Sequence, residues 1–351
     1  MLNVIFAPDY RAGVPYQELL ATALQGQAVN VDFLAGYKRV FPLRRLLAGK
    51  QCDLLHLHWP EAYYPNRKDA FDWVRFARFP FDLKGTIKRC VLATTAHNFY
   101  PHGRAEEPFA KRNVCCVHTN AHVVFAHSAM AKQRLVESFD LPVEKVRVIP
   151  HGDLSVAIGA PLAAPEARRN LGVDSRKIAL MFGTVDPYKG LEEVIAWWHQ
   201  RPQSDVRLAI VGKPCTPQYG ARIVDRIGVS RNILHRLGWL PDDLLKLWLS
   251  AANVVIFNYC AIFTSGAASL ARSYGVPILL PKRLNTVDLD EPTPYVRRFT
   301  EFETDFEEEL AEVLNVAPDY RAASPWRVSC SWDRVADLTI EGYRYAADGM
   351  L

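Results

Sequence analysis

The stretch IALMFGTVDPYKGLEEVIAWWHQRPQSDVRLAIVG, residues 178–212, decides the fold class of this chain. It begins with a short apolar run, turns at Gly183, continues as a helix-length amphipathic segment and ends in a second apolar run closed by Gly212. Two buried strands separated by a helix are typical of a βαβ unit, in which the strands are parallel. We therefore predict an α/β fold, with ligands bound by the loops at the carboxyl ends of the strands.

The same alternation of short apolar runs and amphipathic segments continues along most of the chain. We predict strands at 2–7, 29–34, 54–58, 91–96, 122–126 and 146–150, and a second series at 178–182, 207–211, 233–237, 254–257 and 276–280. Between the two series lies GDLSVAIGAPLAAPEA, residues 152–167, whose composition is typical of a linker. The chain ends in SWDRVADLTIEGYRYAA, residues 331–347, which predicts a capped amphipathic helix that must pack on another element.

The length of 351 residues exceeds what one hydrophobic core usually supports, so two domains are expected. We predict two Rossmann-like, doubly wound parallel-sheet domains, at 1–160 and 161–328, facing a central cleft, followed by a C-terminal helix at 329–351. The loops of both domains would then line the cleft.

Composition excludes several classes of protein. The chain is 49% hydrophobic and 23% charged, as in ordinary globular proteins, and its seven cysteines show no CxxC spacing. It shows neither a secretory signal nor a run approaching the roughly 18 apolar residues of a membrane-spanning helix. Its net charge is only +4, and it carries no recognised nucleic-acid-binding motif. We expect a cytoplasmic protein that does not bind nucleic acid.

Two segments of the second half are suited to phosphate binding. In FGTVDPYKGLEEVI, residues 182–195, Lys189 and Gly190 stand at the start of a helix, where the lysine charge and the helix dipole both favour a diphosphate. In NYCAIFTSGAASLARSYGVPILLP, residues 258–281, Thr264, Ser265 and Gly266 open a helix of small residues with exposed first-turn amides. A solvated lysine and a serine that only caps its helix are the alternatives.

Two further strand ends complete this set. LAIVGKP, residues 208–214, ends in Gly212 and Lys213, and Trp239 in the turn of LGWLPDD could stack on a base or serve only in packing. The candidate ligand-binding residues of the second half are Gly183, Lys189, Gly212, Lys213, Trp239, Thr264, Ser265 and Gly266.

The order and spacing of these segments, from VIPHG at 148–152 to the terminal SWDRVADLTIEGYRY, resemble the GT-B glycosyltransferases. The resemblance includes nearly the whole chain, although the first half matches more loosely. It implies a nucleotide-sugar-dependent hexosyltransferase whose C-terminal domain binds the nucleotide diphosphate and whose last helix returns to the N-terminal domain. It also implies that Lys189, Ser265 and Gly266 contact the donor phosphates, and that Trp239 lies near the base.

The chain departs from the retaining members of that fold in two places. Their pair of glutamates, separated by seven residues, is replaced by Ile262 and Leu270, and the arginine five residues before the motif lysine is replaced by Thr184. These departures, with HLHWPE at 56–61 and the PYKG turn, resemble the β-mannosyltransferases of bacterial xanthan-type exopolysaccharide assembly. That subgroup implies GDP-mannose as donor, a polyprenyl-diphosphate-linked oligosaccharide as acceptor, and inversion at the anomeric carbon.

Inverting transfer requires a general base, which takes the proton of the acceptor hydroxyl as the sugar carbon is attacked. The candidates at predicted strand ends of the first half are, in order, Glu61, Asp9 and His97. Salt-bridged loop carboxylates are the alternative for Glu61 and Asp9. Tyr16, His58 and His151 are assigned to the acceptor side of the cleft.

Neither a metal nor any other cofactor is expected. His56 and His58 alternate on one strand and share a face, but such a pair does not make a metal site by itself. The late DxD string at 288–290 is interpreted as a surface acidic loop. The charge of the leaving diphosphate would be stabilised by Lys189 and by the helix that Ser265 and Gly266 begin.

Residues 70–90, AFDWVRFARFPFDLKGTIKRC, interleave aromatic and basic side chains. Such a surface suits anionic lipid, so we expect peripheral contact with the inner face of the cytoplasmic membrane, where a lipid-linked acceptor lies. A core helix with solvated arginines is the alternative. For the whole protein, the alternatives are a retaining transferase of the same fold and a nucleotide-sugar-binding scaffold that has lost catalysis.

Overall fold

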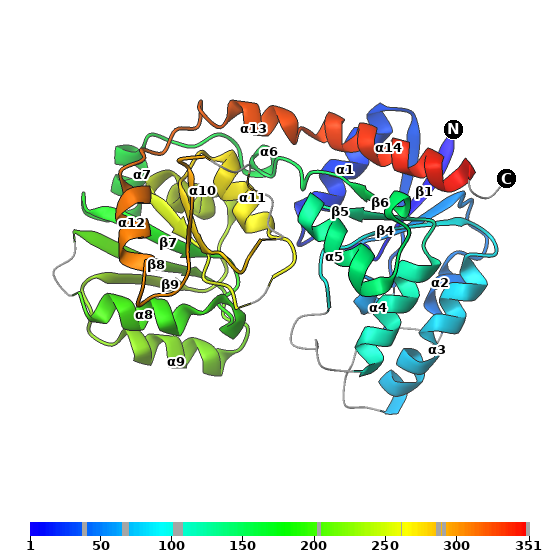
Figure 1. The fold of residues 1–351 in the computed structure, drawn as a ribbon, viewed down its shortest axis with the longest axis horizontal. Helices are drawn as coiled ribbons and strands as arrows, with labels where there is room; N and C mark the ends of the chain where they lie inside the picture. The colour runs from blue at the N-terminus through cyan, green and yellow to red at the C-terminus, as the bar shows by residue number, and fades with distance from the viewer. Residues whose placement is uncertain are drawn as a thin grey trace. The chain divides into compact units, whose positions relative to one another are not determined.

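The computed structural model describes residues 1–36, 41–64, 70–100, 108–201, 205–260, 262–285, 289 and 293–348. The chain forms two compact units, the first made of Met1–Gly152 and Cys330–Leu351 and the second of Asp153–Ser329 (Figure 1). Each unit is built around a six-stranded sheet in which every strand pair is parallel. The predicted α/β class and the two doubly wound sheets are confirmed.

The first unit has the strand order β2-β1-β3-β4-β5-β6. Its strands are β1 (Leu2–Ala7), β2 (Val29–Phe33), β3 (Leu54–Leu57), β4 (Val91–Thr95), β5 (Val123–Ala126) and β6 (Val146–Val148). Its helices are α1 (Pro15–Gly26), α2 (Pro42–Leu46), η1 (Pro60–Tyr63), α3 (Ala70–Thr86), α4 (Pro108–Asn120), α5 (Ala129–Phe139), η2 (Val143–Lys145) and α14 (Trp332–Asp348). The edge formed by the carboxyl ends of β3 to β6 positions the polar residues described below.

Helix α14 returns to this first unit, as the resemblance implied. It packs against α1, β4 and β5, and Tyr343 shares a 2.7 Å hydrogen bond between its hydroxyl and Nδ1 of His56 (Figure 1). Gly342 allows the close approach, because a Cβ there would lie 2.4 Å from the ring of Phe125. The C-terminal helix therefore completes the first core, although it follows the second unit in sequence.

The second unit has the strand order β12-β11-β10-β7-β8-β9. Its strands are β7 (Lys177–Phe182), β8 (Val206–Gly212), β9 (Ile233–Leu237), β10 (Val254–Ile256), β11 (Ile278–Pro281) and β12 (Val296–Phe299). Its helices are α6 (Ser155–Ile158), α7 (Ala164–Leu171), η3 (Pro187–Lys189), α8 (Leu191–His199), α9 (Pro217–Ile227), α10 (Asp242–Ala251), α11 (Gly266–Ser273), α12 (Phe306–Leu314) and α13 (Ser324–Ser329).

Both faces of the second sheet are covered. Along β7, Ile178, Leu180 and Phe182 belong to one buried cluster, whereas Ala179 and Met181 belong to the other. Alternate side chains of a strand point to opposite faces, so both faces must be apolar when helices cover both. This explains why the strands read as continuous apolar runs in the sequence.

The two domain boundaries differ from the predicted ones. The second unit begins at Asp153 instead of residue 161, and it ends at Ser329 instead of residue 328. The linker belongs to the second unit because its backbone is bonded there: Tyr274 donates its hydroxyl to the carbonyl of Gly159, and Leu162 donates its amide to the hydroxyl of Ser250.

All eleven predicted strands are present within about two residues, but β12 was not predicted. Its sequence, VRRF, places two arginines in the middle of a four-residue edge strand, which hides the apolar pattern. Within the described ranges, no helix is both long enough and apolar enough to cross a membrane.

Candidate functional site

Four adjacent strands of the first unit lead into histidines. His58 follows β3, His97 follows β4, His127 follows β5 and His151 lies just after β6. Because the carboxyl ends of parallel strands meet at one edge, the four rings come together there. His97 Nε2 lies 3.2 Å from His58 Nδ1, and His97 Nδ1 lies 3.3 Å from His127 Nε2.

Tyr16 covers this row of rings. Its ring lies edge-on to His97, His127 and His151, with centroid separations of 4.9, 5.6 and 5.3 Å. Tyr16 and His58 are each 1% exposed, and His151 is partly buried. Tyr16, His58 and His151, the three residues assigned to the acceptor side, therefore lie together. Their rings pack against one another, and little of their surface reaches solvent.

Glu61 is the partly exposed carboxylate next to the histidine row. It lies in η1, directly after β3, and its Oε1 accepts a 3.1 Å hydrogen bond from Asn98 Nδ2 at the end of β4. Glu61, Asn98, His58 and His118 line one small hollow. A carboxylate that is held by an amide and still reaches solvent can take up a proton from a bound hydroxyl.

The other two candidates for the general base have the following neighbours. Asp9 accepts two 3.0 Å bonds from the guanidinium of Arg11, and these bonds lower the pKa of its carboxyl. Both ring nitrogens of His97 face other histidines, and burial holds its pKa well below the usual range. The order Glu61, Asp9 and His97 stays a prediction.

Lys189 of the second unit is buried although it was predicted to meet the donor. It lies in η3 after β7, is 6% exposed, and donates a 2.7 Å bond from Nζ to the carbonyl of Phe182. Gly183 lies beside it, because a Cβ there would be 2.9 Å from Nζ. Burial lowers the pKa of Lys189 to about 8.

Gly183 and Gly212 are required by packing. Both have positive φ, and a Cβ on Gly212 would lie 1.9 Å from the carbonyl oxygen of Gly183. The turns after β7 and β8 therefore touch backbone to backbone, which only glycine permits. Beyond them, Lys213 is exposed and Trp239, in the turn after β9, is 74% exposed.

The segment from Thr264 to Gly266 begins α11. Ser265 is its N-cap and accepts a 3.1 Å bond from the amide of Ala268, so the capping role is present. Thr264 and Gly266 are partly exposed on either side of it. The serine hydroxyl satisfies one first-turn amide, and the remaining first-turn amides have no partner within a helix.

Asn258 links the donor-side segments and was not among the predicted residues. Its amide donates to the carbonyl of Gly190 and to Glu193, and its Oδ1 accepts from Arg283. Its position could have indicated a role, because Asn258 is a polar residue two positions after the end of the buried strand β10. Arg283, after β11, brings a cation close to the PYKG turn.

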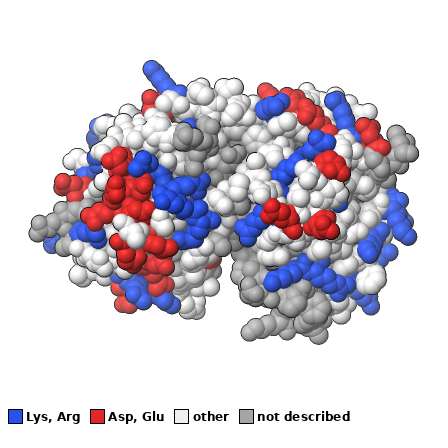
Figure 2. Space-filling model, viewed as in Figure 1, with Lys and Arg blue, Asp and Glu red and all other residues white. Residues whose placement is uncertain are grey.

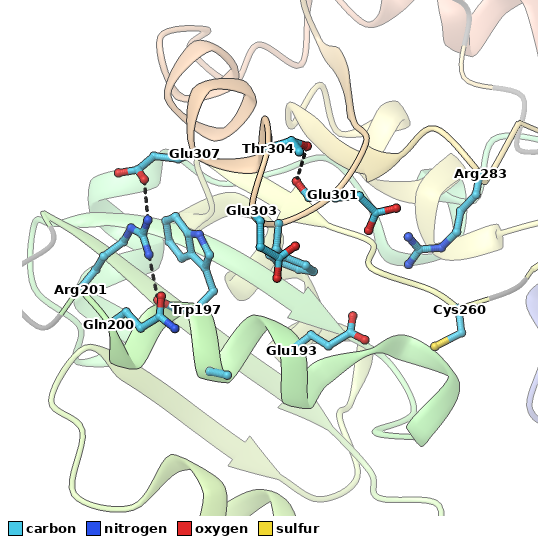
Figure 3. A pocket seen from close by; sticks show the side chains of 12 residues that line it. Glu193, Trp197, Gln200, Arg201, Cys260, Arg283, Glu301, Glu303, Thr304 and Glu307 are labelled. Carbon is cyan, nitrogen blue, oxygen red and sulfur yellow. Dashed lines mark hydrogen bonds and ion pairs between the residues drawn. The ribbon is translucent and has the colours of Figure 1, made fainter.

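A cavity of about 700 Å³ lies beside this network, between α8 and the segment that joins β12 to α12 (Figure 3). Glu193, Glu301, Glu303 and Glu307 outnumber its cations, Arg201 and Arg283. Figure 3 shows Arg201 paired with Glu307. An excess of carboxylates disfavours a diphosphate, so we do not place the donor phosphates in this cavity.

Comparisons with known proteins agree with this architecture. Residues 4–153 match the family described as Glycosyltransferase Family 4. The chain is 27% identical over 312 residues to GDP-mannose:glycolipid 4-beta-D-mannosyltransferase of Xanthomonas campestris pv. campestris, covering 87% of this chain and 83% of that protein.

Solved structures share the fold. Sucrose-phosphate synthase from Thermosynechococcus elongatus superposes with a TM-score of 0.75 at 15% identity, covering 99% of this chain and 100% of that one. HepE from Anabaena, in complex with UDP-glucose, superposes with a TM-score of 0.66 at 14% identity, covering 100% and 99%. The chain is a glycosyltransferase with the GT-B fold. More particularly, it is a hexosyltransferase.

The buried charge of Lys189 predicts a pH-dependent stability. Below pH 8 the folded protein must hold a desolvated ammonium, whereas between about pH 8 and 10.5 it releases the proton before the unfolded chain does, so stability rises with pH. Lys189→Met should therefore be more stable than the wild type at pH 7, by about 3 kcal/mol, and this advantage should shrink towards pH 10.5.

Denaturant unfolding at pH 7 and pH 10 measures this effect. Lys177→Met is the matched control, because Lys177 is exposed at the opposite end of β7. An equal response of the two variants to pH would contradict the assignment of the buried charge to Lys189.

Proposed function

We propose that this chain transfers mannose from GDP-mannose to a hydroxyl of a lipid-linked glycan, with inversion, in bacterial exopolysaccharide or cell-surface glycan synthesis. The supporting observation is the similarity to the Xanthomonas mannosyltransferase over most of both chains. In the retaining alternative, two carboxylates would be expected where Ile262 and Leu270 instead pack in the core of the second unit.

The donor is proposed to lie at the carboxyl ends of β7 and β10, with its phosphates near Lys189 and the start of α11. Lys189 would exchange its bond to the Phe182 carbonyl for a phosphate oxygen, and the anion would restore the full charge of the lysine. The helix end would supply amides and a positive dipole. In this proposal no metal is required for the leaving diphosphate.

The acceptor is proposed to bind at the strand ends of the first unit, with Glu61 as the general base. As the acceptor oxygen attacks the anomeric carbon, its proton passes to Glu61 and the bond to the diphosphate breaks. Attack from the face opposite the leaving group inverts that carbon. Asn98 holds Glu61 in place by the bond to Oε1.

Nucleotide binding tests the donor assignment. In thermal-shift measurements with GDP, UDP, ADP and dTDP, we expect GDP to stabilise the wild type most, and Lys189→Ala to lose that stabilisation. Lys177→Ala should respond to GDP as the wild type does. If no nucleotide stabilises the wild type, the donor assignment fails and the scaffold alternative is favoured.

Turnover tests the general base. Glu61→Gln should reduce kcat by about 10²- to 10⁴-fold and leave the GDP-induced thermal shift unchanged, because the amide cannot accept the proton. Asp9→Asn should reduce kcat less than tenfold, because Asp9 is already bound to Arg11. Unchanged turnover in both variants would refute the assignment. Proton NMR of the product reports whether the anomeric configuration has inverted.

We also propose that α2 and α3 contact an anionic membrane surface. The described side chains from Phe41 to Cys90 include exposed or partly exposed Arg44, Arg45, Arg78, Lys84 and Lys88, and Phe81 is 64% exposed. Asp82 is buried there and holds the amides of Leu43 and Arg44. Figure 2 shows Lys and Arg atoms gathered over these helices. The side chains of Phe71, Trp73, Arg75 and Phe76 lie outside the described residues.

Vesicle flotation tests this surface. The wild type should float with vesicles containing anionic lipid and remain unbound with neutral ones. The double variant Arg78→Glu, Lys84→Glu should lose binding about tenfold or more, at about 1 kcal/mol for each charge lost. The exposed pair Arg222→Glu, Arg226→Glu on α9 is the control. Equal loss in both double variants would contradict a specific surface.

A further inference from the structure

Three histidines at the strand ends of the first unit converge on one point. His97, His127 and His151 follow β4, β5 and β6, and their potential ligand nitrogens all lie within 4.8 Å of one another. We propose that these three residues bind a divalent transition metal of the zinc class. The proposal concerns the first unit only, and it does not depend on the donor, the acceptor or the general base proposed above.

The distances suit such an ion. His97 Nδ1 and His127 Nε2 are 3.3 Å apart, and two nitrogens at the usual zinc–nitrogen distance of about 2.0–2.1 Å are separated by about 3.3 Å in a tetrahedral site. The limit of 4.8 Å for the group is wider, and the last side-chain torsion of a histidine has a broad range, so the His151 ring can adjust to an ion.

A hydrogen bond between two neutral imidazoles explains the contact between His97 and His127 equally well, but it leaves His151 unexplained. Nδ1 of His151 is buried and has no hydrogen-bond partner among the described residues. A buried polar atom without a partner costs about 1–3 kcal/mol, and coordination of an ion would remove that cost. The proposal rests on this atom together with the convergence of the other two rings.

The surrounding residues hold the rings in position for coordination. His127 can donate from Nδ1 to the carbonyl of Ile149, 3.2 Å away, which leaves its Nε2 lone pair pointing at His97. Trp59 stacks on His97 with a centroid separation of 4.2 Å and an interplanar angle of 12°. Backbone carbonyls bonded to the second nitrogen of a metal-binding histidine, and packing that fixes its ring, are the usual supports of a metal site.

The chemistry of the three side chains selects the class of metal. Imidazole nitrogens suit zinc, copper, iron and nickel, whereas magnesium and calcium prefer oxygen ligands. Three protein ligands leave a fourth position for a water or another small ligand.

No pattern in the sequence predicts this site. The histidine pair that stands out in the sequence is His56 and His58. In the structure, both ring nitrogens of His56 are hydrogen-bonded to hydroxyls, those of Tyr343 and Thr95. His97, His127 and His151 are separated by 30 and 24 residues, so no ligand spacing is visible along the chain. Only the parallel register of β4, β5 and β6 brings them together.

Metal analysis of the full chain tests the proposal. The protein, purified without chelators and dialysed against zinc, should retain about one equivalent of the ion, and cobalt should give the intense visible absorption of a tetrahedral site. His127→Gln and His151→Gln should each reduce the bound metal at least tenfold. His118→Gln is the matched control, because His118 is a buried histidine of the same unit outside the group.

The outcomes are separable from misfolding and from the proposed function. Circular dichroism identifies any variant that fails to fold, and X-ray absorption of the wild-type cobalt protein reports nitrogen ligation without any variant. Less than a tenth of an equivalent in the wild type, or full retention of metal by both folded variants, would overturn the proposal. The thermal shift with GDP tests the donor site proposed in the second unit, so its result is independent of the result for the metal site.

Discussion

Parallel pairing of strands is the constraint on which both units depend. It requires every connection to cross over the sheet, so helices cover both faces, and it places all the carboxyl ends on one edge. In the first unit this edge carries Glu61 and the histidine row; in the second it carries Lys189, Asn258 and the start of α11. The candidate catalytic and binding residues are dispersed in sequence, and the parallel register of the strands brings those of each unit to one edge of its sheet.

The polar groups at these edges are held at a cost to stability. Lys189 is almost completely buried and donates a hydrogen bond to one carbonyl, and the rings of the histidine row lie side by side at tilted angles in a largely desolvated position. A buried charge such as that of the Lys189 ammonium is costly, and such charges are typical of sites where a ligand compensates for the cost. The backbone beside Lys189 is held by close packing, because the turns that contain Gly183 and Gly212 are in direct contact.

The C-terminal helix shows how one apolar stripe can join distant parts of the chain. Residues Val335, Ala336, Thr339, Gly342 and Tyr343 are buried on a helix that follows the whole second unit. Tyr343 reaches His56 of β3, and Gly342 meets Phe125 of β5. The first core is therefore completed only after the second unit has been synthesised, which couples its stability to an element outside its own continuous sequence.

The sequence by itself determined the class of fold, because apolar runs of four to seven residues separated by amphipathic segments leave few alternatives to parallel sheets. It also indicated the segments around Lys189 and Ser265 as candidates for phosphate binding, because lysine and serine at the start of a helix are read from local sequence. It missed β12, whose arginines interrupt the apolar pattern, and Asn258, whose role depends on partners 68, 65 and 25 residues away. The convergence of His97, His127 and His151, and the burial that lowers the pKa of Lys189 to about 8, were decided by tertiary structure alone, since register and desolvation arise only when the sheets are assembled.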